Sequence, residues 1–315
     1  MKRKPIIISI SSTSLTSLEK RVIKQCKPWG IILFKRNIKS LKQVINLVKT
    51  IKFIMRDKKY PILIDEEGGR VTRLSNIIQN SNYSQSFFGK LFNSNRSVAS
   101  SIYQNYINSV SNILKIIGVN INTVPVADLF FNKAHKIIGD RSFSSKVLDI
   151  QTLSSNCVSA YKKNKIATVI KHIPGHGRSK VDSHKRLPTV VTSYKTLINE
   201  DFKCFKKTKS LFAMTAHILY SKLDSKNVAT HSKIIIKDII RKKIRFKGLL
   251  ISDDISMKAL KYNIYENSRR ALKAGCNLVL YCKGNTKISE KLLRDSPYID
   301  TFTKKKTSEF YKFLS

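Results

Sequence analysis

Cysteine, proline and glycine are scarce in this chain of 315 residues, which contains 5, 7 and 11 of them. The cysteines are dispersed without a Cys-x-x-Cys pair, which argues against a disulfide framework or a zinc ribbon and indicates reduced thiols in the cytoplasm. No apolar run is long enough to span a bilayer, so we expect no membrane span. The apolar run at residues 6–10 follows a basic start but precedes no cleavage site, and we interpret it as a strand rather than an export signal.

Acidic residues are also scarce, with 20 Asp and Glu against 60 Lys and Arg, giving a net charge of +40. A basic chain suggests nucleic acid, anionic lipid or an acidic substrate as partner. The basic residues run along the whole chain, however, and no nucleic-acid-binding motif is present. We therefore expect no specific nucleic-acid partner, only non-specific binding at low salt. The charge has two interpretations, a preference for an anionic substrate or the codon usage of an AT-rich gene.

Eight short apolar runs alternate with segments of helical apolar spacing. The runs are residues 6–9, 30–34, 61–65, 119–126, 167–171, 211–216, 248–252 and 277–281. The helical stripes cover residues 41–51, 102–114, 235–244 and 259–272. Strands that are apolar on both faces and alternate with helices indicate a parallel sheet covered by helices. Eight such units predict an α/β fold, a single (β/α)8 TIM-type barrel. An open doubly wound sheet is the alternative, although no Gly-x-Gly-x-x-Gly turn supports it.

No domain boundary is evident, so residues 1–315 are predicted to form a single catalytic barrel. The Asn- and Ser-rich tract at residues 75–97 is interpreted as an irregular insertion over the active face. From about residue 302 the chain is interpreted as a solvated basic C-terminal tail.

Polar and titratable residues collect where the predicted strands end, at residues 65–70, 125–128, 171–172, 215–217 and 252–254. The carboxyl ends of all strands of a parallel barrel open on one face, where barrel enzymes carry out their chemistry. Charges scattered over a solvated surface have no reason to follow strand ends. This placement favours an enzyme over a binding module.

The loop after the fifth strand, residues 171–188, holds three of the six histidines and raises the question of a metal. His172, His176, Asp182 and His184 could form a ligand set for a zinc hydrolase. The Pro-Gly pair between the first two histidines, however, prevents the helix that would place them on one face. A serine nucleophile is disfavoured because no Gly-x-Ser-x-Gly motif occurs.

A carboxylate nucleophile with an imidazole proton carrier fits the residues better. Asp253 ends the seventh strand and can attack an anomeric carbon to form a covalent sugar ester. A histidine side chain ordinarily titrates near neutrality, so His184 can protonate the leaving oxygen and later deprotonate water. Asp182, two residues earlier in the same loop, can hold the imidazole of His184 in one tautomer. Because strand alternation turns neighbours apart, we expect Asp254 to point away from the mouth and to cap a helix that starts near Ser256.

Four motifs carry a family resemblance: IDEEGGRVTRL at 64–74, KHIPGHG at 171–177, DSH at 182–184 and ISDDISM at 251–257. Together they resemble glycoside hydrolase family 3, and more narrowly its bacterial β-N-acetylhexosaminidases of peptidoglycan recycling. The resemblance implies a retaining exo-enzyme that removes terminal N-acetylglucosamine from anhydromuropeptides in the cytoplasm without cofactor or metal.

Residue by residue, the resemblance implies the nucleophile at Asp253 and the proton-shuttling pair at Asp182 and His184. The substrate-binding positions of the family fall on Asp65, Arg73, Arg141, Lys171 and His172. We further expect a monomer. Three alternatives stay open: the substrate acetamide as nucleophile, phosphate in place of water as acceptor, or a non-catalytic barrel that binds anionic polymers.

Overall fold

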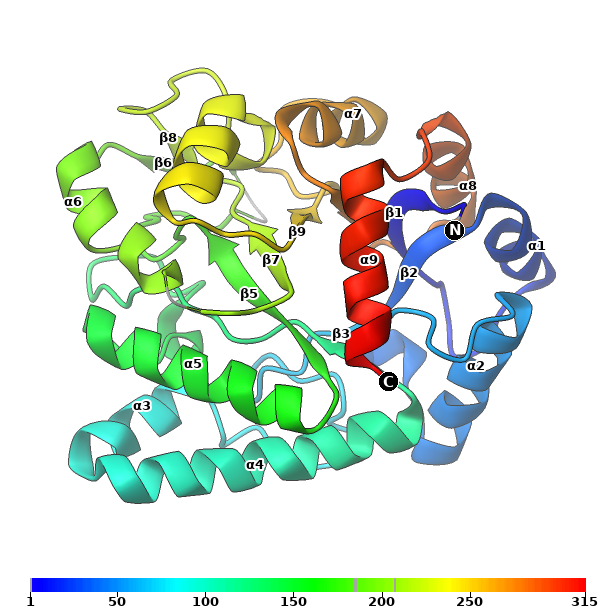
Figure 1. Cartoon of the computed structure of the whole chain (residues 1–315), viewed down its shortest axis with the longest axis horizontal. Helices are drawn as coiled ribbons and strands as arrows, with labels where there is room; N and C mark the ends of the chain where they lie inside the picture. Colours follow the sequence, from blue (N-terminus) through cyan, green and yellow to red (C-terminus); the bar gives the residue numbers. More distant parts are fainter. Residues whose placement is uncertain (1, 184–185, 207) are drawn as a thin grey trace.

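The computed structural model describes residues 2–183, 186–206 and 208–315. Within them, parallel strands close into a barrel in the order β1-β10-β9-β7-β5-β4-β3-β2 (Figure 1). The strands are β1 (Lys4–Ser9), β2 (Pro28–Leu33), β3 (Ile62–Ile64), β4 (Ile121–Asn122), β5 (Ala167–Ile173), β7 (Phe212–Thr215), β9 (Leu249–Asp254) and β10 (Leu278–Tyr281). The predicted TIM-type barrel is thus confirmed. We call the end at which the strands finish the mouth, and the opposite end the floor.

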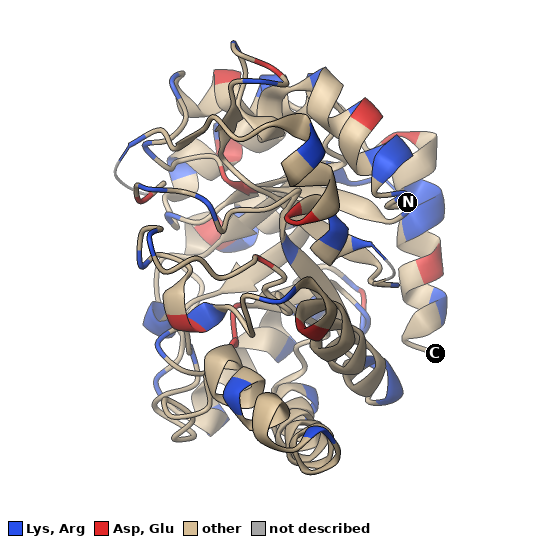
Figure 2. Cartoon of the chain, turned by 90° about the vertical axis from the view of Figure 1, so that its left-hand side faces the viewer, with Lys and Arg blue, Asp and Glu red and all other residues tan. Residues whose placement is uncertain are grey.

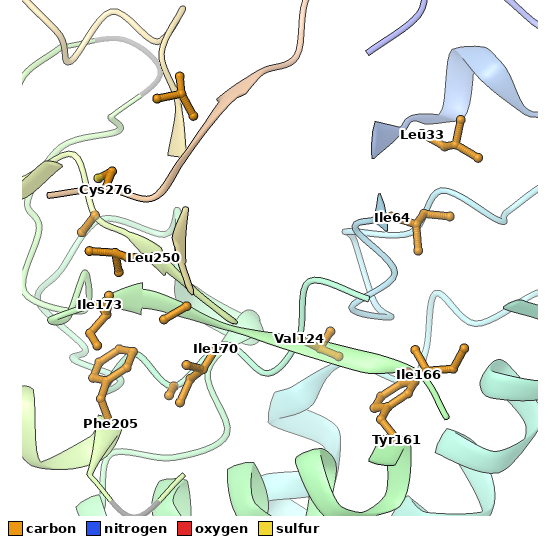
Figure 3. Close-up of a cluster of buried hydrophobic side chains, with 14 of the residues drawn as sticks. Leu33, Ile64, Val124, Tyr161, Ile166, Ile170, Ile173, Phe205, Leu250 and Cys276 are labelled. Carbon is orange, nitrogen blue, oxygen red and sulfur yellow. The ribbon is translucent and has the colours of Figure 1, made fainter. Parts of the chain in front are cut away.

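Two layers of apolar side chains follow from strand alternation, which points successive residues to opposite sides of the barrel wall. Ile7 of β1 joins an interior cluster with residues of the other strands, whereas Ile6 and Ile8 join the cluster between strands and helices. Figure 3 shows part of this outer cluster, in which Ile170 and Ile173 of β5 lie beside Phe205. Both sides of each strand are therefore buried, as the continuous apolar runs predict.

Helices cover the outside of the barrel. They are α1 (Ser17–Cys26), α2 (Leu41–Ile54), α3 (Gln85–Ser94), α4 (Arg96–Ile117), α5 (Val147–Lys163), α6 (Tyr194–Asn199), the π-helix η5 (Ile235–Lys243), α7 (Ile264–Ala274), α8 (Thr286–Asp295) and α9 (Thr301–Phe313). Short 3-10 turns are η1 (Lys35–Asn37), η2 (Gly139–Arg141), η3 (Phe202–Phe205) and η4 (Ala229–His231). Outside the barrel, β6 (Thr189–Val190) pairs in parallel with β8 (Leu219–Tyr220).

Local capping residues fix where these helices begin and end. Thr16 and Glu19 form a capping box at the start of α1, which satisfies two backbone N–H groups reciprocally. Asn95 starts α4 by accepting from the Val98 N–H, and Gly118 ends it in the left-handed conformation at φ 91°. In a barrel each helix runs back from the mouth, so these ends place the connecting loops at the mouth and at the floor alternately.

The expectation of a solvated tail is wrong, because residues 302–313 lie within α9. Phe310 is fully buried and its ring centroid lies 5.4 Å from that of Phe212, at the start of β7. Trp29, near the start of β2, donates from Nε1 to Thr307 Oγ1 at 3.0 Å. These contacts close the floor of the barrel. The basic residues of α9 occupy its other face, which is why composition alone suggested solvent.

Two further expectations need correction. The tract at 75–97 is not wholly irregular, because Ser84 caps α3 within it. In α4 the buried face includes Tyr103, Ile107, Val110 and Leu114. The predicted stripe shares Val110 and Leu114 with this face, but it began at Ile102, which is 40% exposed. Across the described ranges, none of the helices combines the length and the apolar character needed to cross a membrane.

Candidate active site

A cavity of about 250 Å³ opens at the mouth of the barrel. It is lined from several strand ends and the loops that follow them. Predicted substrate-binding and nucleophile residues that line it are Asp65, Arg73, Arg141, Lys171, His172 and Asp253. Residues separated by up to 188 positions in the chain therefore meet in one cavity, where the barrel geometry places chemistry.

Asp65, directly after β3, is held in a charged form by two cations. Its Oδ1 accepts from Thr123 and lies 3.3 Å from Lys171 Nζ, and its Oδ2 lies 3.1 Å from Arg73 Nη2. Burial by itself raises the pKa of Asp65, but Lys171 and Arg73 outweigh it and hold the pKa well below its usual range. The carboxylate is therefore ionised and oriented, and it is suited to accepting hydrogen bonds from sugar hydroxyls.

Glu67 ties two of the cations together, a role that the sequence alone did not reveal. Arg141 donates from Nε and Nη2 to its two carboxylate oxygens at 2.8 and 2.9 Å, and Lys171 Nζ lies 2.6 Å from Oε1. Burial raises the pKa of Glu67, but the two cations lower it to about 2. Glu67 lies two residues after Asp65, and in an extended chain such residues point to the same side. This spacing could have indicated that Glu67 faces the cavity together with Asp65.

Glu66, between them, faces away from the cavity and organises the loop after β3. Its carboxylate accepts from the backbone N–H groups of Arg73 and Leu74 at 2.8 and 2.9 Å and from Thr72 Oγ1 at 2.7 Å. Burial raises the pKa of Glu66. Because these bonds fix the backbone of Arg73, they also set where its guanidinium reaches Asp65.

Asp128 anchors the histidines of the KHIPGH segment. It is fully buried, and its Oδ2 lies 2.7 Å from His172 Nδ1 while its Oδ1 accepts from the His176 N–H at 2.6 Å. His172 Nε2 then lies 3.5 Å from Arg141 Nη2. The pKa of Asp128 is lowered because the histidines outweigh its burial. This acid fixes the orientation of His172 toward the cavity.

His176 lies deeper, and burial together with the neighbouring His172 lowers its pKa to about 4. At neutral pH its ring is therefore uncharged. Its Nε2 lies 3.2 Å from Ser183 Oγ, while its buried Nδ1 has no hydrogen-bond partner within the described part of the chain. The tautomer with the proton on Nε2 suits both observations, since an N–H left without an acceptor costs more than a lone pair left without a donor.

Asp253 and Asp254 both line the cavity, which corrects the expectation that only one of them would face the mouth. Asp254 accepts from Ser256 Oγ at 2.7 Å, from the Ser256 N–H at 3.1 Å and from the Cys282 N–H at 3.2 Å. It thus caps a turn and not the helix predicted to start near Ser256, because the next helix, α7, starts only at Ile264. Asp253 Oδ1 accepts from the Asp254 N–H at 2.7 Å.

The loop that carries the predicted proton shuttle reaches the same cavity. Ser183 lines it, and the Ser183 carbonyl accepts from the Ala259 N–H at 3.1 Å, from the segment that follows β9. Asp182, its neighbour, is half-buried. His184 lies outside the described residues.

His217, two residues after β7, is fully buried beneath the mouth. Its Nδ1 lies 2.7 Å from Thr230 Oγ1 and its Nε2 3.0 Å from the Asp254 carbonyl, so both ring nitrogens are engaged. Burial lowers its pKa. Over residues 2–183, 186–206 and 208–315, no group of three or more His, Cys, Asp or Glu side chains is arranged to hold a metal ion.

Comparison with known proteins decides the family. The model of the glycosyl hydrolase family 3 N-terminal domain matches residues 8–297. The chain belongs to glycoside hydrolase family 3. It is 32% identical over 285 residues to a beta-hexosaminidase of Glaesserella parasuis, covering 88% of this chain and 80% of that protein. It is 30% identical over 297 residues to a beta-hexosaminidase of Nitrosospira multiformis, covering 92% and 83%.

Solved structures of family 3 agree. NagZ from Neisseria gonorrhoeae, in complex with N-trifluoroacetyl-D-glucosamine, superposes with a TM-score of 0.88 at 27% identity, covering 100% of this chain and 91% of that one. The family 3 resemblance that the motifs carry is therefore confirmed, and the solved structures share the barrel fold. This family 3 chain is a glycoside hydrolase.

Proposed function

We propose that this β-N-acetylhexosaminidase of family 3 is a retaining exo-enzyme acting on anhydromuropeptides in the cytoplasm, as part of peptidoglycan recycling. The observation that carries the proposal is the single cavity that unites Asp253 with Asp65, Arg73, Arg141, Lys171 and His172. Support also comes from the beta-hexosaminidase relatives and from the structural similarity to a NagZ that binds a glucosamine derivative.

Asp253 is the proposed nucleophile. Its carboxylate attacks C1 of the sugar while the bond from C1 to the leaving oxygen breaks and His184 protonates that oxygen. The resulting sugar ester is attacked at C1 by water, whose proton returns to His184, and the Asp253 carboxylate leaves. Two inversions at C1 give net retention. Asp182 orients the imidazole in both steps.

The sugar is held by a carboxylate and by cations already fixed in place. Asp65 accepts from two ring hydroxyls, and Arg73, Arg141, Lys171 and His172 donate to hydroxyls and to the acetamide oxygen. Because Asp65 and Glu67 already pair with Arg73, Arg141 and Lys171, and Asp128 holds His172, little side-chain rearrangement is needed on binding.

A chromogenic assay tests the proposal. We expect the protein to release the phenol from an aryl N-acetyl-β-D-glucosaminide and not from the corresponding glucoside. Asp253→Asn should lower kcat on the order of 10⁴-fold and keep N-acetylglucosamine binding in calorimetry. Asp238→Asn, on the exposed face of η5, is the matched control and should keep wild-type turnover. Normal turnover in Asp253→Asn would refute the nucleophile assignment.

Two further measurements separate the open alternatives. A slow fluorinated N-acetylglucosaminide should leave one sugar attached to Asp253 in peptide mass spectrometry, whereas an acetamide nucleophile leaves no adduct. Sugar phosphate that forms only when phosphate is added would identify a phosphorylase. Cleavage of purified anhydromuropeptide in preference to chitobiose tests the physiological substrate.

A further inference from the structure

A groove of about 940 Å³ runs between α1 and α2, away from the active site. Seven cationic side chains border it: Lys20, Arg21, Lys24, Lys49, Lys52, Arg56 and Lys58. We call it the α1/α2 groove. Its residues lie along α1 from Lys20 onward, in the second half of α2 and in the loop that leads into β3, so it extends toward the floor of the barrel, away from the catalytic mouth.

Positive charge by itself does not single out this groove, because Lys and Arg occur in many of the helices and loops seen in Figure 2. The groove differs from several other helical surfaces in its acids. On those surfaces cations have acidic partners along the helix, as Arg270 has Glu266, Arg294 has Glu290 and Lys306 has Glu309. Of the seven groove cations, none makes a salt bridge within the described ranges.

The one acid bordering the groove, Asp57, is already engaged. It forms a salt bridge with Arg3 and accepts from the Tyr311 hydroxyl, both on the floor side. Seven like charges facing one another across a groove repel, which works against folding. An anionic occupant would relieve this repulsion, so the groove is complementary to negative charge.

Apolar side chains project beside the cations. Phe53, in the last turn of α2, is 83% exposed, and Ile116, in the last turn of α4, is 58% exposed. The two helix ends are neighbours, because a Cβ added to Gly118 at the end of α4 would lie 3.0 Å from Val48 Cγ1 and 3.2 Å from Lys52 Nζ. Cations and exposed apolar residues therefore share one end of the molecule.

We propose that the α1/α2 groove binds anionic phospholipid and attaches the enzyme to a membrane surface. The cations contact the headgroups, and Phe53 and Ile116 enter the boundary between headgroups and acyl chains. Nucleic acid fits less well, because its backbone offers no apolar partner for an aliphatic side chain such as Ile116. Attachment through the floor leaves the mouth facing the aqueous phase. This inference is independent of the proposed substrate.

Vesicle sedimentation with the full chain tests the inference. Wild-type protein should sediment with vesicles of phosphatidylcholine mixed with phosphatidylglycerol and stay in solution with phosphatidylcholine alone. Replacing Lys20, Lys24 and Lys49 by Gln should weaken partition on the order of 100-fold, at about 1 kcal/mol per lysine. The matched control replaces Lys195, Lys226 and Lys233, which are exposed on another surface, and should remain within a few-fold of wild type because charge acts over about 10 Å.

Phe53→Ser, at a site too exposed to affect folding, should weaken partition severalfold with no change of charge. Equal losses in the two lysine triples would overturn the proposal in favour of diffuse attraction to the net charge. The proposal is also overturned if a single-stranded oligonucleotide displaces the vesicles and its own binding is lost in the groove triple but unchanged in Phe53→Ser, because that pattern identifies nucleic acid as the occupant.

Discussion

The two ends of the barrel handle positive charge in opposite ways. At the mouth, Arg141 and Lys171 are buried against Glu67, and Arg73 meets Asp65. Toward the floor, the cations of the α1/α2 groove face one another with Asp57 as the acid beside them. Burial explains the difference, because a cation taken out of water needs a partner whereas an exposed one does not.

The comparison shows which charges of a very basic chain are constrained by chemistry. Mouth cations are fixed by specific carboxylates, so each is tied to a position and an orientation. All the groove cations except the half-buried Lys52 are exposed to solvent and keep their freedom, so they can serve only a partner that supplies the missing negative charge. The following experiments perturb the two ends separately.

Glu67→Gln should have the largest effect on stability. It leaves Arg141 and Lys171 buried beside a neutral amide, so we expect the free energy of unfolding to fall by about 3–5 kcal/mol. Denaturant unfolding followed by circular dichroism measures it. Glu266→Gln, which removes the exposed pairs with Arg269 and Arg270, is the control and should remain close to wild type. Similar losses in both variants would contradict the distinction between buried and exposed pairs.

Low pH should lower the stability of the folded protein through His176, which lies at the mouth. Its pKa is lowered from 6.5 to about 4, so between these values the unfolded chain takes up a proton that the folded chain does not. Stability therefore falls as the pH falls from about 6.5 to about 4, by on the order of 3 kcal/mol from this histidine. Unfolding measured at several pH values should show a flatter profile in His176→Gln. Parallel profiles for the two proteins would contradict the assignment.

Ser183→Ala tests how the loop at the mouth is held. Removing the hydroxyl that meets His176 Nε2 should lower kcat about tenfold on a glycoside with a poor leaving group and less on an activated aryl glycoside, since only the first needs the proton donor in place. Ser154→Ala, buried in α5 away from the cavity, is the control. Equal reductions on both substrates would indicate general damage instead.

The smallest effect on stability is expected in the α1/α2 groove, toward the floor of the barrel. Replacing Lys20, Lys24 and Lys49 by Gln should raise the free energy of unfolding by a few tenths of a kcal/mol, because like charges are removed. The gain in stability should shrink in added salt, because salt already screens the repulsion that the substitution removes. A clear loss of stability would show that these lysines have structural partners.

Much of the barrel could be predicted from the chain, because strands buried on both faces leave continuous apolar runs. The run at 6–9 lies within β1 and that at 277–281 contains β10. The run at 119–126 yields only Ile121–Asn122 as β4, because the backbone turns at Val124, whose N–H donates to the Asn122 carbonyl, and Pro125 has no N–H for the sheet. An apolar run therefore predicts that a segment is buried, but it does not predict which of its residues form the hydrogen bonds of a strand.

The candidate site also has a part that could be predicted from the sequence and a part that could not. Motifs placed Asp65, Lys171 and Asp253 at strand ends, and strand ends converge in any parallel barrel. The part played by Glu67 depends on Arg141, which lies 74 residues away, and no local pattern encodes that pairing. Likewise, whether Ile102 or Tyr103 belongs to the buried face of α4 depends on which side of the helix meets α3 and α5.

The aromatic floor has a consequence for synthesis on the ribosome. Trp29 is made early, yet its ring packs against Phe310, which lies 281 residues later in the sequence. β1 likewise pairs with β10, so the ring of strands cannot close before β10 has been made. A nascent chain therefore exposes the apolar side chains at the floor until α9 has been translated, and its first helices must persist beside them in the meantime.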